Sequence, residues 1–463
     1  MRAFQPCLIA VFVGATALGG CSHGAGHATG ALSPSALAQK PSPKLEALAR
    51  RALDDASLAD ELRAEGPLGL DALLSQAKAA GRLDASLDPL IDRVAGQRYA
   101  RYSGLYWYTD LDAAIARAEA EHKPILSLRL LGDLRDDLSC ANSRYFRVVL
   151  YPDPVVGDLL RAGFVLHWSS ERPVPKVTVD YGDGRKLVRT VTGNSIHYVL
   201  DAHGRTVDAI PGLMAARPFA GALSNAAYLA HEVENRSDSE FSDTLRARHA
   251  ERELELLARW QREFRAVGVS IENRDPAALS ALNARLRSDS ESLPESSVDA
   301  ARAGNLAATK AVVEVNLLEQ MTPKAPFSAT DARRQSTLAT WAKVAARHRS
   351  EAVLSEPSRA LMRELAPRGF DVDGHAVPID DAGFAALVDR FEQVLALDSV
   401  RNQLDLAIGI HERLAARPLD SLAELNRWVY ATVFLTPRSD PWLGLTADRG
   451  FTALPSDGIA QAK

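Results

Sequence analysis

The chain has 463 residues with a formal net charge of −5, and 46% of its residues are hydrophobic. A chain of this length can bury about three quarters of its unfolded surface in two or three domains, so it can fold around sizeable cores. The slightly acidic balance excludes the basic surface that nucleic acid or an anionic membrane face requires, so we expect no nucleic-acid partner.

The N-terminal segment has the pattern of a signal peptide. Arg2 precedes an apolar core from about Cys7 to Leu18, which is too short to span a bilayer as a lasting helix of about 20 residues. The tetrapeptide LGGC, which ends at Cys21, resembles the bacterial lipobox, whose cysteine is acylated and becomes the first mature residue. We therefore expect residues 1–21 to be a lipoprotein signal peptide with lipidation at Cys21. Because Ser22 follows instead of aspartate, we expect the outer membrane, facing the periplasm; an ordinary signal peptide with an incidental cysteine is the alternative.

The three cysteines exclude an internal disulfide in the mature protein. Cys7 would leave with the signal peptide and Cys21 would be modified through its sulfur, so Cys140 is the one thiol that remains. In an oxidising envelope, stability must then come from burial.

Residues 22–43 are small, polar and interrupted by prolines, as in a flexible linker. His23 and His27 lie in this linker, and because no third ligand is near, we interpret them as solvated spacer residues. Residues 44–104 carry leucines at near-helical spacing, with a break at Gly66. They predict a helical N-terminal region of several short helices.

Residues 105–235 alternate helix and strand patterns, which predicts an α/β domain around a four- or five-stranded central sheet. The expected elements are a helix capped by Thr109 or Asp110, a strand at Ile125 to Leu131, a helix at about Pro154 to Ala162, a strand at 164 to 168, a β-hairpin around Gly182 to Gly184, and strands at Ile196 to Leu200 and Thr206 to Ile210. The expected core positions include Leu126, Leu128, Val165, Ile196, Tyr198 and Val199.

Several runs in this segment resemble the thioredoxin-like superfamily, in particular its envelope branch. They are DLDAAIARAEAEHKPILSL, SRYF, FVLHW, ERP and YVLDAHGRTVDAIPGL. In that branch KPI leads into the first central strand and LDxxG turns the terminal hairpin. The resemblance implies a thioredoxin-like central sheet domain flanked by mostly α-helical N- and C-terminal regions, and it concerns fold more than activity.

The residues that active members of this superfamily use for redox chemistry are missing. Active members place Cys-x-x-Cys at the start of the helix after the first central strand, where the helix dipole lowers the thiol pKa and the second thiol resolves the mixed disulfide. Here Cys140 comes several residues late and has no resolving partner. The place of the cis-proline opposite the cysteines falls to Ser195. The resemblance therefore implies a domain without dithiol exchange.

Cys140 is the candidate catalytic residue. Asp136 and Asp137 oppose thiolate formation, whereas Arg135, Arg144 and a helix start would favour it. We interpret Cys140 as a buried and inert side chain, because cysteines outside disulfides are commonly buried.

The neighbours of this cysteine indicate packing. Tyr145 and Phe146 can bury large apolar surfaces, and Ser139 or Asn142 can cap a helix start.

The other candidate sites are interpreted as structural features without a chemical role. His167 and His197 could complete a Cys-His pair, but both lie on predicted strands, where hydrogen-bonded structural histidines are common. Ser195 lacks the second glycine of Gly-x-Ser-x-Gly. Residues 371–382 begin like a calcium loop but have Ala376 where glycine is needed, so we interpret them as a turn.

Residues 236–463 predict a helical C-terminal region. An apolar stripe that includes Trp260 indicates a helix with Ser242 or Asp243 as its start and Gly268 as its stop. Further amphipathic runs cover 276–288, 299–320, 329–347, 381–397, 400–416 and 420–435. They share no fixed period, so a repeat solenoid is not supported, and the aromatic tail around Trp442 is expected to dock onto the body.

The sequence therefore predicts a lipid-anchored cell-envelope protein with a redox-inactive thioredoxin-like domain that acts as a binding or structural module for an unknown envelope protein. We expect no cofactor and no metal. The alternative is a monothiol thiol-disulfide oxidoreductase that acts through Cys140 and takes its second sulfur from glutathione or a partner protein.

Overall fold

The computed structural model describes residues 40–190, 194–268, 340–366, 369–370, 376–434, 436 and 438–439. By its internal contacts the chain separates into Met1–Ser35 and Ala36–Lys463, and all described residues belong to the second unit. The predicted signal peptide with Cys21, the linker histidines, the predicted helices at 276–288 and 299–320 and the aromatic tail lie outside the described residues. Within the described ranges, none of the helices combines the length and the apolarity that a membrane crossing needs.

Short helices with their own hydrophobic cluster form the region before the sheet, as predicted. They are α1 (Pro43–Ala52), η1 (Ala56–Leu58), α2 (Ala59–Ala64), α3 (Pro67–Ala79), η2 (Ala85–Leu87), α4 (Asp88–Ala95) and α5 (Ala100–Ser103). Proline occupies the first turn of α1, α3 and α4, where its missing N–H removes no helical hydrogen bond. Gly96, in the left-handed conformation with φ 76°, ends α4.

Hydrogen bonds fix these helices to the sheet domain. The indole Nε1 of Trp168 donates to the carbonyl of Gly96 at 2.9 Å. Arg63 donates to the carbonyl of Trp107 at 2.9 Å, and the amide of Trp107 donates to the carbonyl of Ala95 at 2.8 Å. Through these bonds the end of α4 is held against the sheet.

A four-stranded mixed sheet lies at the centre of the α/β region. Its order is β2 (Val165–Arg172), β1 (Ile125–Leu131), β5 (Ser195–Leu200) and β6 (Thr206–Pro211). β1 and β2 are parallel, and β5 is antiparallel to both β1 and β6. The six predicted core positions, Leu126, Leu128, Val165, Ile196, Tyr198 and Val199, are all buried. The prediction of a mixed α/β fold is thus confirmed.

The helices around this sheet begin and end close to the predicted residues. α6 (Leu111–Glu121) starts at Asp110, whose carboxylate accepts the amide of Ala113 at 2.8 Å. α8 (Pro154–Gly163) precedes β2 as predicted, and α9 (Ala216–Val233), which the sequence analysis did not predict, follows β6. The predicted hairpin forms as β3 (Lys176–Asp180) and β4 (Lys186–Thr190), but it pairs only with itself, so the central sheet has four strands.

The C-terminal region is helical where it is described. It contains α10 (Asp238–Ala266), a helical segment at 340–347, η4 (Arg349–Glu351), α15 (Glu356–Glu364), α16 (Asp381–Arg401), η5 (Asn402–Leu406), α17 (Ala407–Ala416), α18 (Leu422–Trp428) and η6 (Val429–Val433). η5 is a π-helical turn that joins α16 to α17, and η6 is a π-helical turn that continues α18. β7 (Gly369–Phe370) and β8 (Ala376–Val377) pair on either side of residues 371–375, which lie outside the described residues.

The start of α10 differs from the prediction. The N-cap is Ser237, which forms a capping box with Glu240, so the helix begins before the predicted Ser242 or Asp243. The Ser-x-x-Glu signature is present in the sequence, but the apolar stripe that identified the helix begins about five turns later, at Leu256. The predicted stop is confirmed, because Gly268 follows with φ 82°.

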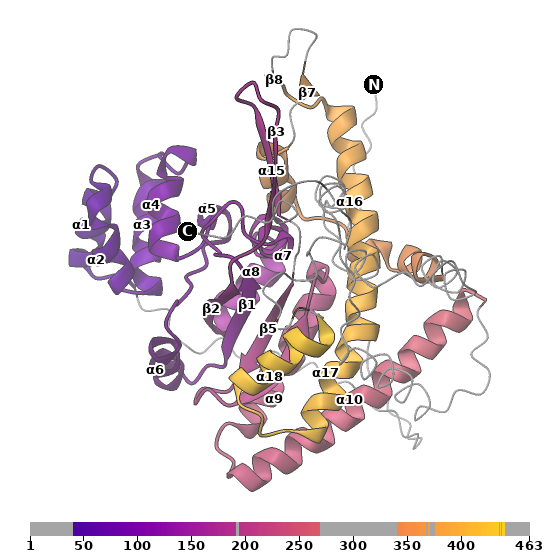
Figure 1. Ribbon diagram of the computed structural model, residues 1–463. Coiled ribbons are helices and arrows are strands. Elements are labelled where there is room, and N and C mark those ends of the chain that lie inside the picture. The colour runs from indigo at the N-terminus through magenta and orange to yellow at the C-terminus, as the bar shows by residue number, and fades with distance from the viewer. Residues whose placement is uncertain are drawn as a thin grey trace, which may run out of the picture. The chain divides into compact units, whose positions relative to one another are not determined.

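The C-terminal helices complete the core of the sheet domain. One hydrophobic cluster contains strand residues such as Tyr198 together with Leu395, Ile410 and Leu425. Figure 1 shows α17 beside α10, and these two helices contact each other closely, while α17 also contacts β6. A second cluster joins the apolar stripe of α10 to Trp341 and the end of α16.

Buried hydrogen bonds reinforce this packing. Tyr198 on β5 donates its hydroxyl to Asn426 on α18 at 3.1 Å. Asn402 donates to the carbonyl of Leu213, just after β6, at 2.6 Å. The sheet and the C-terminal helices are therefore connected by specific polar contacts as well as by apolar surface.

Candidate functional site

Cys140 lies at the end of the loop that follows β1. Its amide donates to the carbonyl of Leu131, the last residue of β1, at 3.1 Å. Its side chain is fully buried, and Sγ accepts the amide of Ser143 at 3.5 Å while lying 3.5 Å from the hydroxyl of the same residue. Cys140 itself is therefore the N-cap of α7 (Ala141–Tyr145), and the prediction that Ser139 or Asn142 would cap this helix was wrong.

The segment after Cys140 is committed to packing. α7 continues without a break into the π-helical turn η3 (Phe146–Leu150), so Cys140 lies at the N-terminal end of one helical run. Tyr145 donates its hydroxyl to the carbonyl of Met214 at 2.8 Å, and Phe146 is completely buried. The predicted packing role of these two aromatic residues is confirmed.

Among the charges that flank Cys140 in sequence, Asp137 is paired elsewhere, whereas Arg144 acts on the thiol electrostatically. Asp137 accepts two hydrogen bonds from Arg98 at 2.8 and 2.9 Å, and the first of these bonds lowers the pKa of its carboxyl. Asp136 accepts the amide of Leu138 at 2.9 Å. Burial lowers the pKa of Arg144, whose guanidinium donates to Thr190 at 2.9 Å. Burial of the thiol and the nearby Arg144, rather than acidic neighbours, thus bear on its reactivity.

The two strand histidines are buried structural groups. His167 on β2 lies 2.9 Å from the hydroxyl of Ser127, and His197 on β5 lies 2.8 Å from the hydroxyl of Tyr151. Burial lowers the pKa of His167 to about 4 and that of His197 to about 3, so both rings are neutral at neutral pH. The hydrogen-bond partners of these rings are therefore Ser127 and Tyr151 rather than Cys140.

Ser195 opens β5 and is fully buried. Its hydroxyl has no hydrogen-bond partner in the described part of the chain, so no base is placed to activate it. The described peptide bonds include no cis bond at this or any other place. The geometry assigns this residue no chemistry.

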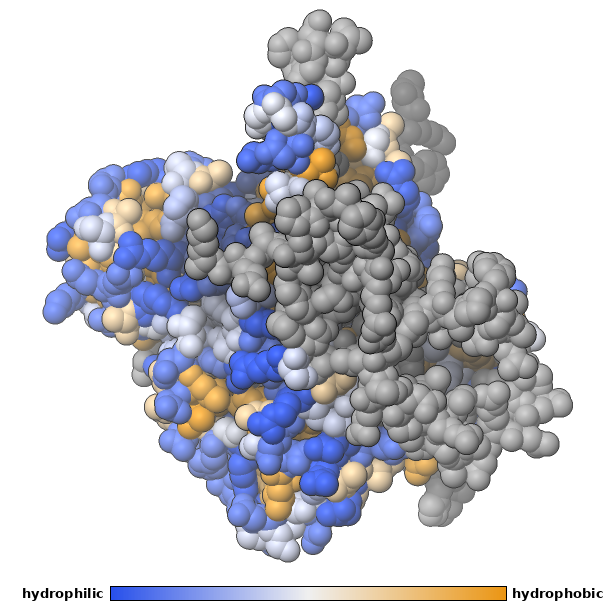
Figure 2. Space-filling view, in the orientation of Figure 1, coloured by the Kyte–Doolittle hydropathy of each residue, from blue (hydrophilic) through white to orange (hydrophobic). Residues whose placement is uncertain are grey.

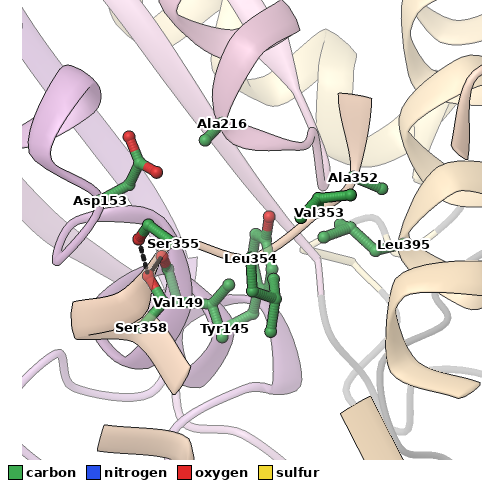
Figure 3. A pocket seen from close by; sticks show the side chains of 10 residues that line it. All are labelled: Tyr145, Val149, Asp153, Ala216, Ala352, Val353, Leu354, Ser355, Ser358 and Leu395. Atoms are coloured by element: carbon green, nitrogen blue, oxygen red, sulfur yellow. Dashed lines mark hydrogen bonds between the residues drawn. The ribbon is translucent and has the colours of Figure 1, made fainter. Parts of the chain in front are cut away.

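A small pocket opens near α7, with a cavity of about 10 Å³, which is about the space that one water molecule needs (Figure 3). The polar groups in its wall already bind within the protein: Ser355 and Ser358 bond each other at 2.8 Å, and Asp153 accepts the amides at the start of α8. These polar side chains of the described wall thus already have hydrogen-bond partners within the protein, and they do not indicate a ligand.

The exposed large hydrophobic residues lie on different elements. The most exposed are Val155 on α8, Tyr228 on α9 and Leu419 between α17 and α18. On the face seen in Figure 2, hydrophobic residues of the described surface occur in small groups among hydrophilic ones. Scattered apolar residues of this kind are normal on soluble surfaces.

Asp208, His249 and His411 form a cluster that the sequence analysis missed. They come from β6, α10 and α17, and one ligand-type atom from each lies within 4.8 Å of the other two. Nδ1 of His249 is 2.9 Å from Nδ1 of His411, which is 3.9 Å from the Asp208 carboxylate. The one sequence signal is that His249 follows Leu245 by four residues and so shares its inward face.

Comparison with known proteins finds no matching family model, no matching curated protein and no matching solved structure. The functional argument therefore depends on the residues and their geometry alone.

Proposed function

We propose that the chain is a lipid-anchored cell-envelope protein whose α/β domain is a binding or structural module without thiol redox activity. The observation that carries the proposal is the complete burial of Cys140 together with its role as the N-cap of α7. Thiol exchange requires a thiolate that an incoming disulfide can reach. A buried thiol that accepts a helix amide is poorly suited to that reaction.

The thioredoxin-like interpretation is part of the same proposal. β1 follows the residues KPI, and the sequence LDAHG forms the turn between β5 and β6, both at the places that the resemblance implies. Two parallel strands, a terminal antiparallel pair and a following helix are consistent with it. Fold alone assigns no activity, so the proposed role depends on the site.

The proposal is tested by thiol accessibility in the native protein. An aromatic disulfide reagent should react with Cys140 far more slowly in buffer than in denaturant. In a thiol-trapping experiment on envelope extracts, wild type and Cys140→Ala should capture the same proteins. A mixed-disulfide partner that only the wild type captures, together with loss of function in the variant, would establish the monothiol alternative.

The anchor is tested separately. Cys21→Ala should abolish incorporation of labelled fatty acid and leave the precursor uncleaved at this site. Label that still appears on the variant would exclude the lipobox interpretation, and Cys140→Ala, which should be acylated normally, is the matched control.

A further inference from the structure

The Asp208, His249 and His411 cluster lies where the C-terminal helices pack against the edge strand of the sheet. Edge strand β6 supplies the carboxylate, and α10 and α17 supply one imidazole each. His249 is almost fully buried, whereas the side chains of Asp208 and His411 retain 13% and 10% of their exposure. The cluster is therefore enclosed by protein and still has a narrow route to solvent.

The hydrogen bonds of His249 define its tautomer. Its Nε2 lies 2.9 Å from the carbonyl oxygen of Val207, which can only accept, so Nε2 carries the proton. The Nδ1 lone pair of the neutral ring then points toward His411. Ligand histidines in metal sites are held in this way, with the distal N–H bonded to a backbone carbonyl.

The distances between the donor atoms suit a small cation. Two donor atoms that bind the same metal ion at about 2.0 to 2.1 Å lie about 2.9 to 3.4 Å apart when the angle between them at the metal is between a right angle and the tetrahedral angle. The two Nδ1 atoms are separated by 2.9 Å, and the His411 nitrogen and the Asp208 oxygen by 3.9 Å. The two nitrogens are therefore already at the spacing of bound ligands, and the carboxylate, which lies within 4.8 Å of both, would have to move closer to complete the set.

The charged groups that act on the Asp208 carboxylate include the cluster's own His249 and the more distant Arg252. Among the described residues, no Lys or Arg nitrogen lies within 4.0 Å of Asp208, whose Oδ1 accepts the amide of Ala209 at 2.7 Å. Arg252 pairs with Glu255 at 2.8 Å. Burial raises the pKa of the Asp208 carboxyl and lowers that of the His411 ring, since both charged forms lose hydration.

We propose that Asp208, His249 and His411 bind a divalent first-row transition metal of the zinc type. Two imidazoles and one carboxylate are donors that such ions accept, whereas calcium and magnesium prefer all-oxygen sites. Three protein donors leave a coordination position open on the solvent side for water or a small anion. The bound metal would join the sheet edge to α10 and α17. Without metal, the His411 N–H donates to His249 Nδ1.

The test is zinc binding by the full chain after treatment with a chelator and dialysis against Zn²⁺. Elemental analysis should find one zinc per chain in the wild type and in a His23→Gln, His27→Gln control, which removes the histidines of the N-terminal linker. His411→Gln and Asp208→Asn should each weaken binding at least about tenfold, while His203→Gln, on an exposed ring, should not.

Cobalt replaces zinc in a second measurement, which leaves the three proposed ligands unchanged. Co²⁺ added to wild type and to Cys140→Ala should give the same visible absorption bands, without the intense charge-transfer band of a thiolate ligand. Any of three results would overturn the proposal. The first is absence of zinc from the wild type, and the second is loss of zinc in the linker variant or in Cys140→Ala. The third is unchanged zinc binding in a folded His249→Gln, His411→Gln double variant.

Discussion

At the residue scale, Cys140 acts in the structure as a helix cap. Its Sγ accepts the amide of Ser143 and is enclosed by the core. Sulfur is a weak acceptor, and a serine hydroxyl at the same position is among the best N-caps. Substitutions of Cys140 therefore measure how much the N-cap contributes to the free energy of unfolding.

We predict that Cys140→Ser keeps the free energy of unfolding within about 1 kcal/mol of wild type, whereas Cys140→Ala is less stable than Cys140→Ser by about 0.5 to 2 kcal/mol. Urea unfolding of the two variants measures this difference. An alanine variant as stable as the serine variant would show that the cap contributes nothing.

Burial also defines the charge state of His197. Its pKa is lowered to about 3 because the charged ring would lose hydration, while the ring in the unfolded chain titrates near 6.5. The neutral ring favours the folded state. This contribution is complete above pH 6.5 and is lost as the pH falls from there toward 3.

We predict that wild type loses about 2 kcal/mol more stability than His197→Gln between pH 7 and pH 5. Glutamine can keep a hydrogen bond to Tyr151 but does not titrate. Urea unfolding at the two pH values tests the prediction, with His231→Gln, a partly exposed ring, as the control that should follow wild type. Parallel pH profiles for wild type and His197→Gln would refute it.

At the scale of elements, Arg205 connects the terminal hairpin to two helices. From the turn between β5 and β6 it bonds Asp201 at 2.7 Å and donates to the carbonyls of Val233 and Glu234 at 3.0 Å. These carbonyls belong to the end of α9, where no helical N–H remains to bond them. The guanidinium also lies 4.1 Å from the centre of the Phe241 ring on α10.

We predict that Arg205→Lys destabilises the protein by about 1 to 3 kcal/mol, because an ammonium group cannot serve the carboxylate, the helix end and the aromatic face together. Arg185→Lys, at the exposed turn of the β3–β4 hairpin, should change stability by less than about 0.5 kcal/mol. Equal thermal unfolding of the two variants would contradict this role.

The elements were predictable wherever short-range chemistry defines them. Asp110 caps α6, proline and glycine residues lie at the ends of β1 and in the hairpin turns, and alternating apolar residues indicate strands. Each of these signals acts within a few residues. The Asp208, His249 and His411 cluster was not predictable, because its members meet only after the sheet and two distant helices have packed. The cap at Cys140 was missed because sulfur is a rare N-cap.

At the scale of the whole molecule, the described sheet and the C-terminal helices share one core. Leu425 on α18 is completely buried in the same cluster as the strand residues. Removing its side chain should therefore weaken the sheet, although the residue is more than two hundred positions away in the sequence.

We predict that Leu425→Ala lowers the free energy of unfolding by about 2 to 5 kcal/mol and speeds hydrogen exchange of the β5 amides. Leu419→Ala, on a side chain that is 59% exposed, should leave both unchanged. If exchange in β5 were unaffected by Leu425→Ala, the C-terminal helices would have to unfold independently of the sheet.

The shared core also has a consequence for the order of synthesis. A chain that is synthesised from its N-terminus presents the apolar face of β5 and β6 well before α16, α17 and α18 have emerged to cover it. During that interval the strands offer both apolar surface and an open edge, the two features that promote aggregation. A holding chaperone would therefore have its greatest effect on this protein before the last helices have been synthesised.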